Sequence, residues 1–288
     1  MDQRDYEALH NAAGTIELQR GKIALTGEDR VRWLHGMVTN DVKGLTPGTG
    51  CYCFVLDVLG HVQADCNVYM EQDRLIVDCE AFLTAKLMTW FDRYIVMDDV
   101  QMTDISAEMQ TVAVEGPSAT AAAIDTDGWI AFPVPRGVWL WGRDIHVPSE
   151  KAVPVSAEAY EVVRIESGIP RYGTDIDDTV IANETGQLRA LHFNKGCYLG
   201  QEIVERVRSR GHVNRIFTGF RSNTEIAPGT FEGGRITSAA FSPALNRWIA
   251  LGYIRRDQAD QPAPGMEVTQ LPFVPAAPAA VFQPPAQD

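Results

Sequence analysis

The sequence lacks the common motifs of metal, nucleotide and phosphate binding. It holds no HExxH or HxxxH pair, no CxxC, no Walker A loop and no complete GxGxxG. These absences exclude the usual interpretations as a zinc enzyme, a P-loop protein or a Rossmann dehydrogenase. No apolar run approaches the roughly 18 residues that a membrane-spanning helix needs, so we expect no membrane partner.

Positive charge is also scarce. The 288 residues include 25 lysines and arginines against 38 aspartates and glutamates, which gives a net charge of −13 at pH 7. Proteins that bind duplex nucleic acid usually present a basic face to the phosphates, so we expect no direct duplex binding. The five cysteines are an odd number without disulfide-like spacing, and the N-terminus has no apolar signal core. Both features predict a reducing, cytoplasmic location.

The patterns that are present predict an α+β fold. Apolar residues recur at helical spacing within residues 25–42, and Thr26 is a candidate N-cap for this helix. Two β-strands are expected next, joined by a turn near Gly60.

The second half of the chain is expected to form a helix, then an irregular loop, and then a strand-rich domain. Ser156 is a candidate N-cap of a helix that ends at Gly168, a glycine in the position that commonly follows a helix. Residues 171–191 have little periodicity and predict an ordered, irregular loop. After Gly211 come short strands divided by glycine and proline, which favour a small barrel or sandwich.

The segment richest in chemical groups is NKGCYLGQEIVERVRSRGHVNR, residues 194–215. Cys197 lies between Gly196 and Gly200, just before a predicted helix, and Lys195 stands close to it. The helix dipole and the lysine charge both favour the thiolate, which attacks electrophiles and binds metals. A buried cysteine that packs a tight turn is an equally open alternative, because sequence does not report exposure.

The same segment is basic within an acidic chain. Between residues 195 and 215, five basic and two acidic residues give a net charge of +3. A helix would place Arg206 and Arg210 on one face. This patch suits the anionic tail of a cofactor or a nucleic-acid phosphate. A solvated helix face that pairs with acidic neighbours is the more ordinary alternative.

Two carboxylates are further candidates. Glu166, near the end of a predicted helix, has the chemistry to accept hydrogen bonds from a heterocycle with N–H groups. Asp65 lies in a predicted strand among apolar neighbours, where a charged residue is either on the wet face or functional. Cys51, Cys53 and Cys66 lie on neighbouring predicted strands, which leaves a metal site open, although free cysteines commonly pack as small core residues.

Together these segments resemble a known superfamily. KGCYLGQE resembles the signature of the YgfZ family, whose eukaryotic relatives act late in mitochondrial iron–sulfur assembly. Four other segments are similar to the aminomethyltransferase (T-protein) of glycine cleavage: LTGEDRVRWLHGMVTNDV, GHVQADCNVY, RIESGIPRYGTDID and WIALGYIRRD. The matching segments run from residue 25 to residue 257.

The resemblance implies a ring of three small domains around a central hole that binds tetrahydrofolate. It implies ferredoxin-like α+β N-terminal domains and a small C-terminal β-barrel. We expect residues 1–215 to form the folate-binding α+β region, as two intertwined subdomains that are discontinuous near residues 50 and 150. Residues 216–275 would form the barrel, and the Pro- and Ala-rich residues 276–288 a flexible tail.

The resemblance also implies roles for single residues. Glu166 would hold the pterin ring, and Tyr172, in the same segment, would contact the cofactor. Asp65 would lie near the reactive edge of the folate. Lys195, or the arginines after it such as Arg206, would face the glutamate side of the cofactor.

Four functions stay open at this point. The leading hypothesis is a tetrahydrofolate-binding accessory protein for iron–sulfur cluster assembly or repair, which would indirectly support tRNA modification by iron–sulfur enzymes. Cys197 would then be a nucleophile or a transient cluster ligand, and the partners would be assembly factors or client iron–sulfur enzymes. The alternative is a folate-dependent aminomethyltransferase or demethylase, disfavoured by the KGCYLGQE motif and the short chain after Arg215. The last two are a folate-binding module without chemistry and direct RNA binding through residues 206–215.

Overall fold

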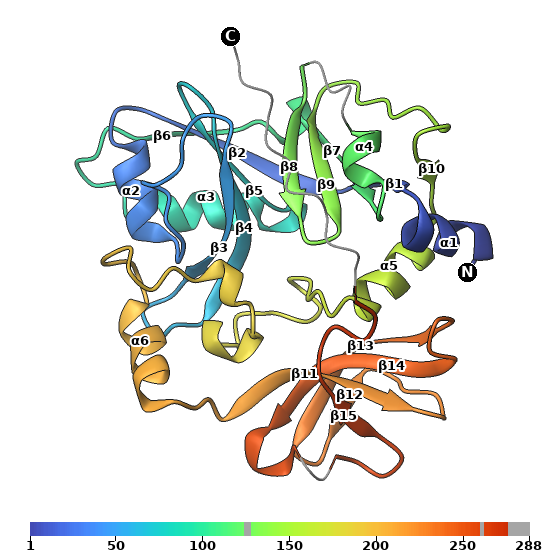
Figure 1. Cartoon of the computed structure of the whole chain (residues 1–288). Helices are drawn as coiled ribbons and strands as arrows, with labels where there is room; N and C mark the ends of the chain where they lie inside the picture. The colour runs from blue at the N-terminus through green and yellow to red at the C-terminus, as the bar shows by residue number, and fades with distance from the viewer. Residues whose placement is uncertain (124–127, 260–261, 276–288) are drawn as a thin grey trace.

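The computed structural model describes residues 1–123, 128–259 and 262–275, and the expected flexible tail at 276–288 lies outside these ranges. The described residues form three five-stranded sheets with α-helices beside them (Figure 1). The predicted α+β class is therefore confirmed. Within the described ranges, no helix is both long and apolar enough to cross a membrane.

The first sheet has the strand order β10-β1-β7-β9-β8. Its strands are β1 (Gly14–Leu18), β7 (Gln110–Glu115), β8 (Ile130–Val134), β9 (Gly137–Gly142) and β10 (Val153–Pro154). Three helices lie in the same part of the molecule (Figure 1), namely α1 (Gln3–Asn11), α4 (Ala119–Ala122) and α5 (Ala157–Glu166).

The second sheet has the order β3-β4-β5-β2-β6 and carries the largest hydrophobic core. Its strands are β2 (Arg20–Thr26), β3 (Gly50–Leu56), β4 (Val62–Met70), β5 (Leu75–Glu80) and β6 (Gln101–Asp104), and its helices are α2 (Arg30–Met37) and α3 (Thr84–Asp92). Strand β4 is buried from Val62 through Val68, so both faces of its central part are covered. Polar side chains on this strand therefore lie inside the protein.

The chain alternates between these two sheets. It leaves the first sheet after Leu18, completes the second within residues 20–104, and returns to the first at Gln110. We expected the changeover near residues 50 and 150, and the sheets place it earlier at both points. Intertwining of this kind puts residues 16–20 at the junction of the two sheets.

The third sheet, β12-β13-β14-β11-β15, lies below the other two in Figure 1. Its strands are β11 (Arg215–Ser222), β12 (Gly229–Phe231), β13 (Gly234–Ser242), β14 (Arg247–Arg255) and β15 (Glu267–Thr269), and α6 (Gln201–Arg210) precedes it. Among the residues that the structure describes, no ladder joins the edge strands β12 and β15. The strand pairing is that of an open sheet, whereas we expected a closed barrel.

The predicted N-cap of the first long helix, Thr26, is wrong, because this residue belongs to the strand that precedes the helix. Thr26 ends strand β2 instead of starting a helix, and α2 begins at Arg30 with Asp29 at its N-cap position. Strand β2 continues this far because it pairs with β5 on one side and β6 on the other, up to the pair Thr26–Gln101. Tertiary pairing overrides the local signal here.

Other local predictions are confirmed. The Ser156 hydroxyl accepts a hydrogen bond from the Ala159 amide at 3.4 Å and so caps α5. Gly168 follows α5 with φ +66°, a conformation that favours glycine. The described segment 171–191 holds no α-helix or strand, only two short 3₁₀ turns, Ala182–Thr185 and Leu188–Ala190.

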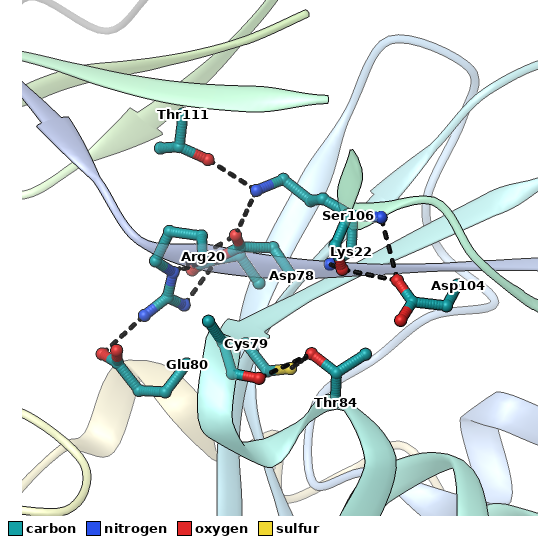
Figure 2. A network of polar contacts seen from close by, with 11 residues as sticks. Arg20, Lys22, Asp78, Cys79, Glu80, Thr84, Asp104, Ser106 and Thr111 are labelled. Carbon is teal, nitrogen blue, oxygen red and sulfur yellow. Dashed lines mark hydrogen bonds and ion pairs between the residues drawn. The ribbon is translucent and has the colours of Figure 1, made fainter. Parts of the chain in front are cut away.

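A buried group of charges joins the first two sheets (Figure 2). The Asp78 carboxylate on β5 accepts hydrogen bonds from Lys22 and Arg20 on β2, both at 2.7 Å. Lys22 also donates to the Thr111 hydroxyl on β7, in the other sheet, at 2.5 Å. Burial raises the pKa of Asp78, but the Arg20 and Lys22 charges outweigh it and hold that pKa below its usual value. Because Lys22 and Asp78 are fully buried, each needs the other's charge.

Replacing Asp78 with Asn should therefore destabilise the protein strongly. The change leaves buried Lys22 without its carboxylate partner and Arg20 with Glu80 alone, and we expect the free energy of unfolding to fall by about 3–5 kcal/mol. Glu202→Gln is the matched control, because Glu202 pairs with Arg206 at 2.5 Å on the surface, where loss of a pair costs about 0–1 kcal/mol. Urea denaturation measures both variants. Equal losses in the two would contradict a central role for this network.

Candidate functional site

A cavity of about 890 Å³ lies between the first two sheets. Residues of β1, β7, β8 and β9 line it from the first sheet, and residues of β2 to β5 line it from the second. Helix α5, the loop 169–174 and single residues such as Phe82 and Arg189 also form part of the wall. Among the described residues, none from the third sheet lines this cavity. Its volume falls in the usual range for small-molecule sites, roughly 300–1,000 Å³.

Asp65 on β4 is the most unusual group in the wall. Its side chain is 8% exposed, and the Tyr52 hydroxyl donates to Oδ2 at 3.0 Å. The other oxygen, Oδ1, is buried and has no hydrogen-bond partner within the described part of the chain. Burial raises the pKa of Asp65, and the charge of Arg20 opposes this effect only in part. A carboxylate held on one oxygen and free on the other is ready to meet a ligand's N–H or O–H group.

Tyr52 keeps its proton beside this carboxylate. Burial, and then the negative charge of Asp65, raises the pKa of Tyr52 well above its usual value. The hydroxyl therefore remains a donor across the physiological range and fixes the orientation of Asp65. Tyr52 and Asp65 lie on adjacent strands, with Tyr52 opposite Asn67 in the β3–β4 ladder.

The part of the wall made by α5 and the loop after it carries paired charges. Arg164 contacts Asp175 and Glu161, both at 2.7 Å, and Arg171 contacts Glu161 at 3.1 Å. Because each of these cations has a carboxylate partner, this wall presents neutralised ion pairs and aromatic side chains to the cavity, and little net charge. Tyr160 adds to it by donating to a Glu115 oxygen at 2.8 Å.

Of the six residues predicted for the site, the structure brings two to the cavity. Asp65 and Tyr172 both line it. Tyr172 is 6% exposed and donates its hydroxyl proton to the Val62 carbonyl oxygen at 3.2 Å, while burial raises its pKa. The hydroxyl proton of Tyr172 is therefore already used within the protein, which leaves the ring and the acceptor lone pairs for a ligand.

Glu166 does not line this cavity, and its predicted place against a pterin ring stays a prediction. Its fully buried carboxylate accepts hydrogen bonds from Tyr6 at 2.8 Å and Ser242 at 2.5 Å, and it contacts His10 at 2.7 Å. The reason is helical geometry: Glu161 and Arg164 face the cavity, whereas Glu166 lies on the face of α5 that packs against α1. Glu166 joins α1, α5 and the third sheet.

The predicted basic and thiol residues also lie away from the cavity. Lys195 is half-buried and donates to the carbonyl oxygens of His35 and Val38, the latter at 2.7 Å. Burial lowers the pKa of Lys195 to about 8. Cys197 is exposed on the loop before α6, and Arg206 on α6 pairs with Glu202. Lys195 and Arg206 therefore do not line this cavity, and their predicted position at the glutamate side of the cofactor stays a prediction. The Arg210 side chain lies outside what the structure describes.

The possible metal site on the strands is not formed. Cys53 and Cys66 oppose each other on β3 and β4 and are fully buried, while Cys51 is partly buried. A hydrogen bond with Cys51, together with burial, raises the pKa of Cys53, and burial raises that of Cys66. No group of three metal-ligating side chains exists in the described ranges. These thiols pack in the core.

Sequence reasoning missed Tyr52, Arg20 and Arg189, which all line the cavity. Tyr52 carried a usable signal, since it alternates with Cys51 and Cys53 and so must face the opposite side of its strand. The other two carried none, because an arginine's role depends on partners that are distant in the sequence.

Comparison with known proteins identifies similar domains. Residues 1–127 match the GCVT N-terminal domain, and residues 213–288 match the Glycine cleavage T-protein C-terminal barrel domain. The aminomethyltransferase of Nostoc sp. is 27% identical over 87% of this chain and 79% of the relative. The aminomethyltransferase of Thermoanaerobacter pseudethanolicus is 25% identical over 87% of this chain and 80% of the relative. The two family models thus match both ends of the chain.

A solved structure shares the fold. The glycine cleavage system aminomethyltransferase T from Bartonella henselae superposes with a TM-score of 0.82, at 17% identity, over 96% of this chain and 90% of that one. This likeness establishes the three-sheet architecture and does not itself assign an activity.

Because the pKa of Asp65 is raised, the effect of Asp65→Asn on the free energy of unfolding should depend on pH. A carboxyl group whose pKa is higher in the folded state stabilises the fold below its unfolded pKa, and that contribution is lost as pH rises through the folded value. Asp65→Asn removes this loss, so the variant should be more stable than wild type at pH 7, by about 0.5–2 kcal/mol. The difference should shrink toward pH 4. Thermal unfolding between pH 4 and pH 8 measures it, with exposed Asp73→Asn as control. A pH-independent difference would contradict the buried position of Asp65.

Proposed function

The chain belongs to the glycine cleavage T-protein family, and from this premise we propose that it transfers a one-carbon unit to tetrahydrofolate in the cavity between its first two sheets. The observation that carries the proposal is Asp65, a buried carboxylate with one oxygen bound by Tyr52 and the other without a partner among the described residues. Relatives at about 25% identity bear the name aminomethyltransferase, which favours this activity over a purely accessory role.

The cavity suits a reduced pterin. A pterin is a flat ring system with several N–H groups, and the cavity offers aromatic side chains from Tyr52, Phe82, Trp139 and Tyr172. The unpartnered oxygen of Asp65 supplies an acceptor for an N–H group at the same wall. An apolar, aromatic pocket with a few convergent polar groups is the usual form of a cofactor or substrate site.

The residues of the chain act on protons and orientation. Tetrahydrofolate supplies the amine nitrogens that accept a one-carbon unit. Asp65 accepts a hydrogen bond from an amine N–H and removes the proton, and its raised pKa brings it closer to the operating pH of a general base. Tyr52 holds the carboxylate in place by donating to Oδ2, while Arg20 limits the rise in pKa so that Asp65 stays available as a carboxylate.

A second candidate function rests on Cys197. This thiol is exposed on the loop before α6 and outside the cavity, as a cysteine that meets a partner protein or a transient iron–sulfur cluster would be. The candidate is a folate-binding accessory role in iron–sulfur cluster assembly or repair. It is independent of one-carbon transfer, because the thiol and Asp65 belong to different parts of the molecule.

Calorimetry and turnover test the first proposal. We expect tetrahydrofolate to bind wild type under anaerobic conditions and to bind Tyr172→Ala about tenfold more weakly. With an aminomethyl donor, Asp65→Asn should form methylene-tetrahydrofolate about 100-fold or more slowly than wild type. The control is Arg206→Gln, which changes a surface ion pair and should match wild type in both assays. Undiminished turnover by Asp65→Asn would rule out the general-base role.

Cys197→Ser tests the second candidate. If the thiol serves iron–sulfur assembly, the variant should keep wild-type tetrahydrofolate affinity and one-carbon transfer, because Cys197 does not line the cavity. It should fail to restore iron–sulfur enzyme activity in a strain that lacks the protein. Full restoration by Cys197→Ser would eliminate this candidate and leave the one-carbon proposal intact.

A further inference from the structure

The side chain of Asn40, on the loop after α2, connects two segments that are far apart in the sequence. Its amide nitrogen donates to the Tyr52 carbonyl oxygen on β3 at 2.8 Å and to the Arg189 carbonyl oxygen at 2.9 Å. Both acceptors are carbonyl oxygens, so the nitrogen must face them, and both of its N–H groups are used. The Asn40 Oδ1 atom accepts from the Asp41 amide at 2.9 Å. The polar atoms of Asn40 thus bind the protein itself, and Asn40 does not line the cavity.

The neighbouring residue, Thr39, reinforces this connection. Its hydroxyl donates to the Ala190 carbonyl oxygen at 2.6 Å and accepts from the Phe54 amide at 2.8 Å. Its backbone carbonyl oxygen accepts from the His192 amide at 3.0 Å. Strand β3 is at the edge of its sheet, and these bonds join that edge to the 3₁₀ turn Leu188–Ala190.

This turn places the Arg189 guanidinium over the Tyr52 ring. The guanidinium lies 4.1 Å from the ring centroid, in a cation–π contact. Within the described part of the chain, Arg189 has no carboxylate partner, and its Nε atom donates to the Gln187 side chain at 3.3 Å. The hydroxyl of the same ring donates to Asp65 Oδ2 at 3.0 Å. One ring therefore meets Arg189 on its face and Asp65 at its hydroxyl.

We propose that Asn40 is a positioning residue for Asp65, because it holds Tyr52 and Arg189 together and so fixes the ring whose hydroxyl orients the carboxylate. The inference rests on the proposed one-carbon function, and it names the residue that prepares the general base of that site. Tyr52 lies on an edge strand and lines the cavity, so its ring lacks the dense packing that fixes a core side chain. The contacts of Asn40 and Arg189 replace part of that packing.

A purely structural role is the competing explanation for Asn40. In that case its removal lowers the stability of the fold and leaves Asp65 unaffected. A positioning residue acts through the Tyr52 hydroxyl, so its removal should have little further effect once that hydroxyl is absent. A structural role adds its effect to that of any other change, and a double-mutant cycle therefore separates the two explanations.

The titration of Asp65 tests the positioning role without requiring catalysis. Carboxyl-carbon NMR of aspartate-labelled protein measures its pKa, and the signal is identified by its absence from Asp65→Asn. Burial raises the pKa of Asp65, and the Arg20 charge, the Tyr52 hydrogen bond and the Arg189 charge each lower it. The other titratable groups that interact with Asp65 are Asp78, Glu80 and Tyr172.

Asn40→Ala should shift the measured pKa of Asp65 upward, because it loosens both the Tyr52 hydrogen bond and the placement of Arg189. In a Tyr52→Phe background, the same replacement should produce a clearly smaller shift. Only the Arg189 charge is then left to move.

Turnover with an aminomethyl donor gives the second measurement. Asn40→Ala should lower kcat about fivefold, and less than about twofold when Tyr52→Phe is already present. The affinity for tetrahydrofolate should stay at the wild-type value, since Asn40 does not line the cavity. The matched control is Asn183→Ala, because the Asn183 amide also donates to a backbone carbonyl oxygen, that of Val204 at 3.3 Å, outside the cavity. This control should match wild type in turnover and in the Asp65 titration.

Urea denaturation establishes whether Asn40→Ala is folded. If it is not, Arg189→Gln takes its place, because this side chain is exposed and its loss leaves the backbone contacts of the turn intact. Arg189→Gln should raise the pKa of Asp65 and lower kcat, in both cases by less than Asn40→Ala.

Two results would overturn the inference. One is an unchanged pKa of Asp65 in Asn40→Ala, or in Arg189→Gln where that variant replaces it. The other is an equal effect of Asn40→Ala with and without the Tyr52 hydroxyl. The proposed function fails separately. If wild type transfers no one-carbon unit but the Asp65 titration responds to Asn40→Ala as expected, the reaction is wrong and the positioning role stands. Normal turnover with an Asp65 titration that does not respond to Asn40→Ala keeps the reaction and removes the positioning role.

Discussion

The architecture depends on one buried carboxylate shared by two cations. Asp78 receives Arg20 and Lys22 from the neighbouring strand, and Lys22 continues to Thr111 in the other sheet (Figure 2). Buried charged groups that are removed from water must pair with each other. The two sheets therefore pack in the arrangement that brings Lys22 to both Asp78 and Thr111. The same arrangement sets the width of the cavity, because Arg20 is at once a member of the network and part of the cavity wall.

The network also sets the electrostatics of the site. The charge of Arg20 opposes the effect of burial on Asp65 more than that of Arg189 does, and it limits how far burial raises the pKa of that carboxyl group. A carboxylate kept buried and half-satisfied lowers the stability of the fold, which is a common property of groups that are placed for chemistry. The Lys22–Asp78 pair stabilises the fold, whereas the buried charge of Asp65 destabilises it. Asp78 and Asp65 lie on adjacent strands, β5 and β4.

The features that depend on residues close in the sequence, such as helix ends, could be predicted from the sequence. Ser156 and Gly168 bound α5 as their types suggest, and Asp65 was singled out because a charge within an apolar strand needs a reason. The surroundings of Glu166 could not be predicted, because its partners Tyr6 and Ser242 come from segments 160 and 76 residues away. Arg189 had no signal at all, since what distinguishes it is the lack of a carboxylate partner in the described structure, and only coordinates report that. The KGCYLGQE motif favoured an iron–sulfur role, whereas the family matches at both ends of the chain favour the proposal of one-carbon transfer.

The central claim is that Asp65 meets the reactive amine of tetrahydrofolate in the cavity between the first two sheets. A crystal structure of the wild-type protein with tetrahydrofolate, grown without oxygen, tests it most directly. The account predicts the reduced pterin against Tyr52 and Tyr172, with an N–H group within hydrogen-bonding distance of Asp65 Oδ1 and the Tyr52–Asp65 contact intact. Folate bound elsewhere, such as beside Cys197 and α6, with an unchanged and empty cavity, would contradict it.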